Sequence, residues 1–83
     1  MPNFHIELRT AERIWETITV ELEDMTALRI EVARFVGELL RDHAEKIWVD
    51  EEWRVDATDA NGLILFVMHL SVTDSAALLK LKR

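Results

Sequence analysis

Three histidines, His5, His43 and His69, are the residues of this chain best suited to metal binding or proton transfer. His5 and His69 fall at outward positions of two predicted strands, and Glu7 falls on the same side as His5. If those strands were neighbours, these three side chains would form a site for a metal ion. We expect exposed sheet residues there instead, and we predict neither a metal site nor a cofactor. His43 lies near the end of a predicted helix, where a charged imidazole interacts favourably with the helix dipole.

The carboxylates and hydroxyls do not form the pattern of a catalytic site. Asp50, Glu51 and Glu52 are adjacent in the chain, whereas acid–base catalysis needs carboxylates that converge in a pocket. Ser71 and Ser75 lie in no nucleophile motif, and the sequence contains no phosphate-loop, dinucleotide, zinc or calcium motif. Cysteine is absent as well, which removes disulfides and thiol nucleophiles. We therefore expect no enzymatic activity.

The length and charge of the chain limit its partners. Its 83 residues, of which 49% are hydrophobic, suit one domain with its own core. We predict a single domain over residues 1–83, with a core fold in residues 1–72 and a C-terminal extension in residues 73–83. The formal net charge is −6, and the one basic cluster is Lys80, Lys82 and Arg83. Because phosphate backbones are bound by clustered cations, we predict no nucleic-acid partner.

No segment of the sequence resembles a membrane anchor or a secretion signal. The first residues lack a basic start followed by a long apolar run. The longest apolar run, Leu63–Met68, is far shorter than the roughly 20 residues that a membrane span requires. A small domain without disulfides also suits a reducing compartment. We predict a cytoplasmic protein.

One amphipathic helix is predicted from Asp24 to Lys46. At 100° per residue, an apolar arc faces one way and charged residues face the other. The arc comprises Met25, Leu28, Val32, Phe35, Val36, Leu39, Leu40 and His43. Asp24 is placed to cap the first turn, since its carboxylate can accept from free backbone N–H groups there. The helix is expected to cover a sheet with its apolar arc.

Two strands are predicted before this helix. Asn3–Arg9 alternates between apolar and polar residues, as a half-buried strand does. Ile14–Leu22 is rich in β-branched residues and alternates again. The inward residues are predicted to be Phe4, Ile6, Leu8, Ile14, Ile18, Val20 and Leu22. Trp15 then points outward with its threonine neighbours.

Two further strands are predicted after the helix, beyond a connector at Ile47–Glu52. Trp53–Asp59 and Leu63–Val72 flank Asn61-Gly62, a strong hairpin signal. A loop of two or four residues places one set of side chains on a common face: Trp53, Val55, Ala57, Ile64, Phe66, Met68 and Leu70. A loop of three residues would place Leu65 and Val67 on that face instead. We favour the first register.

These elements predict an α+β fold in the order β-β-α-β-β, with one long helix covering one face of a four-stranded, mainly antiparallel sheet. Thr73–Arg83 is compatible with a short final helix or with an irregular tail. The last strand is apolar on both sides, although one helix covers only one face of a sheet. We therefore predict that the open face is buried in a homodimer, with an interface formed by Trp15, Leu63, Leu65 and Val67.

The predicted function is that of a small, non-catalytic interaction module that associates with itself. Large apolar patches on a domain usually mark an interaction surface. The alternative is a regulatory or antitoxin-like module that binds a partner protein or a small ligand. In that case the tail from Leu78 to Arg83 would contact the partner.

The sequence opens with Met-Pro before a strand, has Asp24 before the predicted helix and has an Asp59–Gly62 turn before the last predicted strand. With these features it resembles a family of short bacterial proteins classed as a domain of unknown function. Members open with Met-Pro and a strand rich in Phe, Tyr or His, as residues 1–5 do here. A Glu-Leu-Pro-Asp-Leu turn leads into their helix, and Glu21–Met25 takes that place here with Glu at the proline position. An Asp-x-x-Gly turn, here Asp59–Gly62, precedes a strand that contains Leu65-Phe66. The resemblance spans residues 1–72 and implies an α+β fold, without an activity, a cofactor or a catalytic residue.

Overall fold

A computed structural model describes residues 1–50 and 52–81, and it has the predicted α+β architecture. Glu51 of the predicted acidic run and Lys82 and Arg83 of the predicted basic cluster lie outside the described residues. In chain order the elements are β1 (Asn3–Arg9), β2 (Ile14–Glu21), α1 (Met25–Asp42), α2 (Ala44–Asp50), β3 (Glu52–Asp59), β4 (Ile64–Ser71) and α3 (Ala76–Leu81).

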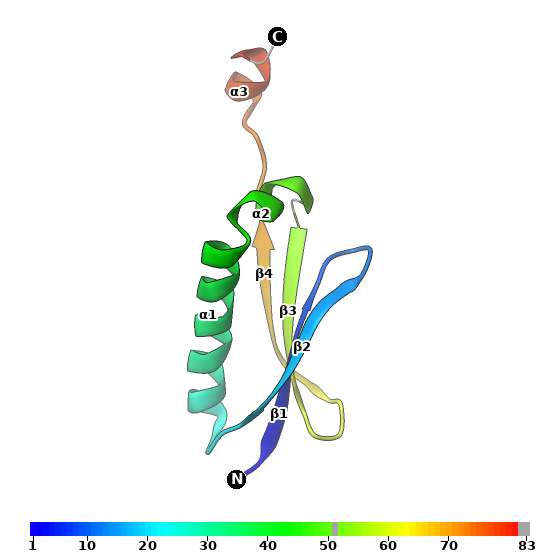
Figure 1. Ribbon diagram of the computed structural model, residues 1–83, viewed down its shortest axis with the longest axis vertical. Helices are drawn as coiled ribbons and strands as arrows, with labels where there is room; N and C mark the ends of the chain where they lie inside the picture. The colour runs from blue at the N-terminus through cyan, green and yellow to red at the C-terminus, as the bar shows by residue number, and fades with distance from the viewer. Residues whose placement is uncertain (51, 82–83) are drawn as a thin grey trace.

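The strands of the described residues form one antiparallel sheet in the order β2-β1-β3-β4. The first hairpin, β1–β2, therefore joins the second, β3–β4, through pairing of β1 with β3. Helix α1 runs alongside the sheet, whereas α3 stands beyond the end of β4 (Figure 1). This order leaves β2 and β4 as the two edges of the sheet.

The hydrophobic core lies between α1 and one face of the sheet. The central strands β1 and β3 supply alternate residues, as the period of a half-buried strand requires, and α1 supplies residues spaced three or four apart. Its buried members are Phe4, Ile6, Leu8, Leu28, Val32, Phe35, Leu39, Ile47, Trp53, Val55 and Ala57. The amphipathic pattern thus predicted most of the buried residues of β1, β3 and α1. It missed Ile47, and five residues that it placed inward are exposed: Ile14, Met25, Leu40, Ile64 and Met68.

Helix α1 begins at the predicted cap but ends earlier than predicted. A carboxylate oxygen of Asp24 accepts the backbone N–H of Ala27 at 2.8 Å, which satisfies one of the free donors of the first turn. At the other end, His43 leaves the helical conformation with φ −124° and ψ 35°. The single helix predicted through Lys46 is therefore interrupted at His43, and α2 follows.

Helix α2 takes the place of the connector predicted at Ile47–Glu52. The change of direction at His43 brings Ile47 into the core, where it is buried. The indole Nε1 of Trp53 donates to the Ile47 carbonyl oxygen at 3.4 Å. This segment is helical because Ile47 is held against Trp53 at the start of β3. Sequence periodicity over so short a stretch does not reveal such a tertiary contact.

The β3–β4 hairpin forms at the predicted Asn61-Gly62 turn. Gly62 has φ +87°, a conformation that glycine adopts without the strain of a side chain. The Asp59 carboxylate accepts the N–H groups of Asn61 at 2.9 Å and Leu63 at 3.0 Å. The favoured register is confirmed over most of β4, because Ala57 pairs with Phe66 on the helix-covered face.

Irregularities in the pairing change which way several side chains point. In the first hairpin Leu8 pairs with Glu16, but Arg9 pairs with Ile14, so Trp15 is an extra residue. The predicted directions of Ile14 and Trp15 are therefore wrong: Ile14 shares the open face with Arg9. A β-bulge has this effect because one inserted residue shifts the alternation by one.

A second irregularity lies at the turn end of the other hairpin. Thr58 pairs with Ile64 although Ala57 pairs with Phe66, which leaves Leu65 as the extra residue of β4. Ile64 therefore lies opposite Thr58 on the open face, and its predicted place in the core row is wrong. The remaining members of that row keep their predicted face.

We expect Asp24→Ala to lower the free energy of unfolding by about 0.5–2 kcal/mol, because the first turn of α1 loses its side-chain acceptor. Chemical denaturation followed by circular dichroism measures this change. Glu38→Ala, an exposed site on the same helix, is the control and should stay within about 0.5 kcal/mol of the parent. Equal effects of the two substitutions would contradict the capping role of Asp24.

Candidate interaction surface

Trp15 lies on the helix-covered side of the sheet, so its predicted position on the open face is wrong. Its ring centroid is 5.3 Å from that of Trp53, with the planes tilted by 45°. The Lys46 ammonium lies 5.0 Å from the Trp15 ring centroid, and the Arg13 guanidinium 3.8 Å from it. Trp15 thus extends the core at the end of the sheet, since tilted aromatic pairs at this distance are favourable contacts.

The other residues of the predicted interface do not lie together on one face. Leu63 is exposed in the turn before β4, and Leu65 is half-buried against the core. Val67 is exposed on the open face, opposite Asp56 of β3. The open face therefore carries Val67 from the predicted set, and the interface itself stays a prediction.

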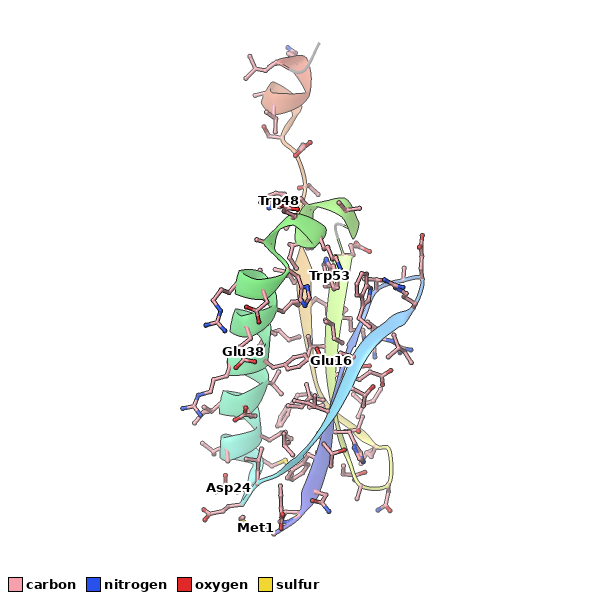
Figure 2. The ribbon with its side chains drawn as sticks, viewed as in Figure 1. Met1, Glu16, Asp24, Glu38, Trp48 and Trp53 are labelled. Atoms are coloured by element: carbon pink, nitrogen blue, oxygen red, sulfur yellow. The ribbon has the colours of Figure 1, made fainter. Side chains whose placement is uncertain are left out.

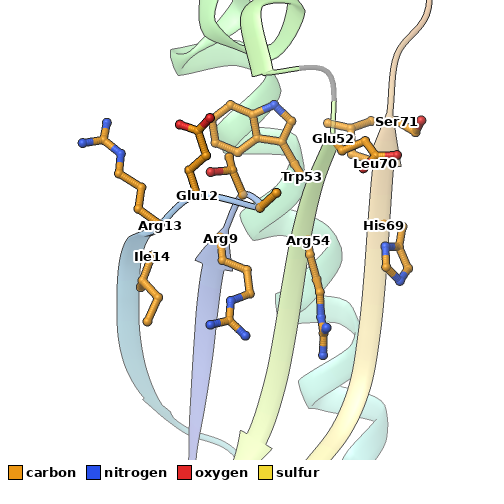
Figure 3. A pocket seen from close by; sticks show the side chains of 12 residues that line it. Arg9, Glu12, Arg13, Ile14, Glu52, Trp53, Arg54, His69, Leu70 and Ser71 are labelled. Atoms are coloured by element: carbon orange, nitrogen blue, oxygen red, sulfur yellow. The ribbon is translucent and has the colours of Figure 1, made fainter.

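The open face is polar and charged where an apolar surface was expected. Strand pairing sets Arg9, Arg54 and His69 in one row across β1, β3 and β4. We call these three residues the arginine row, and Figure 3 shows their side chains on the side of the sheet opposite α1. Like charges directly opposite each other on neighbouring strands are destabilising, so the two arginines need a compensating anion.

Asp56 supplies that anion from the next row of β3. It is only 2% exposed, and one carboxylate oxygen accepts the Arg54 Nε–H at 2.5 Å. Its other oxygen lies 3.8 Å from a terminal nitrogen of Arg9. A buried carboxylate is tolerated only when it is paired with a positive charge. Asp56 is paired with one arginine of its own strand and one of β1, which becomes its neighbour only in the folded chain.

A hollow of about 690 Å³ opens beside the arginine row. It lies between the β1–β2 loop and the ends of β3 and β4, and its walls include Glu12, Glu52 and Trp53 (Figure 3). This volume is in the range of small-molecule sites, about 300–1,000 Å³. The hollow therefore has the size for a small ligand and carries both signs of charge.

His5 and His69 do not share a site. Strand β3 separates β1 from β4, and His5 lies in a different row, opposite Thr58. The His5 Nδ1 and the Thr19 hydroxyl oxygen are 3.0 Å apart. Within residues 1–50 and 52–81, no group of three or more histidine and acidic residues is arranged to hold a metal ion.

Strand β4 is an edge with exposed apolar side chains on both sides. Ile64 and Val67 lie on the open face and are 48% and 43% exposed, while Met68 pairs with Val55 on the other face and is 38% exposed. An edge strand presents unpaired backbone N–H and C=O groups, which a further strand can bind. β4 thus offers a row of backbone groups with apolar contacts on either side.

The flank of α1 continues this apolar surface. The Arg29 guanidinium lies 4.8 Å from the centroid of the Phe66 ring, so this side of the helix faces β4. Met25 and Leu40 share that side at helical spacing and are exposed. We name Met25, Leu40, Ile64, Val67 and Met68 the edge patch.

The opposite edge of the sheet, strand β2, carries charged side chains. Strand β2 carries Glu16, Thr17 and Glu21, all exposed. Charged residues along an edge oppose the addition of another strand. Figure 2 shows Glu16 on β2 and Glu38 on the facing side of α1. The two edges of this sheet are therefore unequal, and β4 is the one without charge protection.

The structure thus defines a small α+β domain with one unprotected edge strand. The model of the family described as "Domain of unknown function (DUF6894)" matches residues 3–71. The chain belongs to that family, which confirms the resemblance to a domain of unknown function. No curated protein and no solved structure matches the chain. Across the described residues, every helix is too short or too polar to cross a membrane.

We expect Asp56→Asn to lower the free energy of unfolding by about 1.5–3 kcal/mol, because two opposed guanidiniums lose their charged partner. The matched control is Glu7→Gln, which removes a more exposed carboxylate 3.8 Å from Arg9 and should cost at most about 1 kcal/mol. Urea denaturation monitored by tryptophan fluorescence measures both. An Asp56 variant as stable as the Glu7 variant would contradict the bridging role.

Proposed function

We propose that this chain is a non-catalytic module that associates with itself through the edge of β4. In this arrangement the β4 strands of two copies pair antiparallel about a two-fold axis. The two sheets then form one continuous sheet, with both α1 helices on the same face. The edge patch of each copy meets that of the other, as an isologous contact requires.

The observation that supports this proposal most directly is the exposure of apolar side chains on both sides of β4. Strand addition combines backbone hydrogen bonds with side-chain contacts on alternate faces. Ile64 and Val67 would pack on one face of the joined sheet, and Met68 on the other. The eight residues of β4 provide a contact about 27 Å long.

The polar open face favours this edge over the face-to-face dimer that the sequence suggested. Stacking two open faces would bury the arginine row against another arginine row. Desolvating charges costs several kcal/mol per ion unless new partners form. Pairing at the edge leaves Arg9 and Arg54 in contact with water, so no such cost arises.

The setting proposed for this module is the cytoplasm. The absence of cysteine suits a reducing compartment. Its net charge of −6 opposes nucleic acid as a partner. The buried Asp56 carboxylate is engaged by Arg9 and Arg54 in the fold, which supports a role without catalysis.

We expect the purified chain to sediment as a dimer at tens of micromolar, and Val67→Lys to sediment as a folded monomer. A lysine on an edge strand opposes pairing because its charge would be placed in the new contact. Sedimentation equilibrium gives the mass, and circular dichroism checks the fold. A parent chain that stays monomeric up to hundreds of micromolar would overturn the proposal.

Thr17→Lys is the matched control for that substitution. Thr17 and Val67 lie at opposite ends of the same row, Thr17 on β2 and Val67 on β4. Both variants add one lysine to an exposed edge position on the same face. Thr17→Lys should leave the dimer intact. Leu65→Lys, by contrast, should weaken the fold itself, because Leu65 packs against the core.

A second candidate function is the binding of a small anion at the arginine row. Arg9 and Arg54 are held side by side by Asp56 and are partly exposed, and His69 follows them in the row. Guanidinium groups bind carboxylate and phosphate through paired N–H donors. Glu12 and Glu52 on the walls of the hollow would repel a large polyanion, which leaves a compact anion as the candidate ligand.

For this second function we expect weak, millimolar binding of inorganic phosphate to the parent chain. Arg54→Gln should abolish it, because the central guanidinium of the row is lost. Arg34→Gln on the exposed face of α1 removes the same charge elsewhere and should leave binding unchanged. Chemical-shift changes in a phosphate titration report the site. Equal loss in both variants would mean that binding is a general charge effect.

A further inference from the structure

The C-terminal helix α3 lies apart from the rest of the fold. Residues 72–75 leave the end of β4 without helix or strand structure, and α3 (Ala76–Leu81) stands beyond the sheet (Figure 1). Leu78 and Leu81 are exposed. Isolated helices shorter than about 12–15 residues are marginal in water. A helix of six residues therefore needs a surface that stabilises it.

The arm formed by residues 72–81 ends in an apolar segment that carries one basic residue, Lys80. After Asp74 the sequence contains no acidic residue, and Lys80 is followed in the sequence by Lys82 and Arg83. A complementary surface would combine exposed apolar side chains with negative charge. Such complementarity guides which surfaces associate and in which orientation.

Residues of these two kinds lie at the other end of the molecule (Figure 1). Glu23 and Asp24 precede α1 and are exposed, and Met25 follows them at the start of the edge patch. Leu63, at the turn before β4, is 64% exposed. Figure 2 places Asp24 at the opposite end of the domain from the segment that leads to α3. The arm of a chain therefore points away from its own acidic end.

Antiparallel pairing of two β4 strands brings these two features together. Strand β4 begins at the Leu63 end and finishes where the arm begins. A two-fold axis at the middle of β4 reverses the second copy, so its arm emerges beside the Leu63 end of the first. The same operation places the first arm at the acidic end of the second.

We propose that the two copies exchange their C-terminal arms across the β4 edge. Leu78 and Leu81 of each arm pack against Met25 and Leu63 of the other copy, and Lys80 faces the acidic residues before α1. The contact stabilises α3 and extends the interface beyond the edge patch. This inference rests on the proposed self-association and specifies the partner surface of the arm.

The absence of cysteine from the chain allows a direct test by site-specific cross-linking. Full-length Leu81→Cys is mixed with isotope-labelled Met25→Cys, refolded together and treated with a short bismaleimide. The control mixture pairs Leu81→Cys with Trp48→Cys, an exposed position on α2 at the arm's own end of the domain. Mass spectrometry identifies adducts between labelled and unlabelled chains.

We expect the Met25 mixture to give at least about tenfold more mixed adduct than the Trp48 mixture, since docking raises the effective concentration of the two thiols. Introducing Lys80→Glu into the Leu81→Cys chain should reduce this yield. Equal yields in the two mixtures, from a chain that sediments as a dimer, would overturn arm exchange and leave self-association standing. An efficient cross-link within a Trp48→Cys/Leu81→Cys double variant would likewise overturn it, by placing the arm on its own chain. A monomeric parent chain would overturn both proposals.

Discussion

The whole structure depends on one constraint, which is that a single long helix has to cover a sheet of four strands. Helix α1 has 18 residues and is therefore about 27 Å long but only about 10 Å across. The axes of the two edge strands of such a sheet lie about 14 Å apart. A single helix therefore cannot shield the full width of the sheet. The core gathers under α1 at β1 and β3, and the apolar residues of β4 remain partly in water. The exposed edge is a geometric result of this small architecture.

Much of this fold could be predicted from the sequence because it depends on hydrophobic periodicity and on the chemistry of neighbouring residues. The alternation of β1, the apolar arc of α1, the Asp24 cap and the Asn61-Gly62 turn each rest on a few neighbouring residues. The directions of Ile14, Trp15, Ile64 and Leu65 were not predictable in the same way. Each depends on an extra residue in a strand, and an inserted residue has no compositional signature of its own. One such residue is enough to move its neighbours in the strand to the opposite face of the sheet.

The candidate sites required knowledge of which strands are neighbours. Alternation correctly placed Arg9 and Arg54 on the face away from the core, but it did not reveal that β1 pairs with β3. Only that pairing places the Arg9 and Arg54 guanidiniums on neighbouring strands, opposite each other. It also explains why Asp56, which contacts both of them, is buried. The available signal was the presence of several charged residues, Arg9, Arg54 and Asp56 among them, at outward positions of two strands that also supply the core. The unequal protection of β2 and β4, in contrast, can be recognised from the sequence once the edges are known.

The pairing of β1 with β3 also has a consequence for how the chain reaches its fold. Arg9 pairs with Arg54 and Phe4 with Asp59, which are separations of 45 and 55 residues. Contacts between such distant positions are formed late and slow the search for the native state. During synthesis the first hairpin and α1 leave the ribosome before their central partner strand exists. The inner edge of β1 therefore stays open until β3 has been made, and this nascent interval is when the protein is most exposed to misassembly.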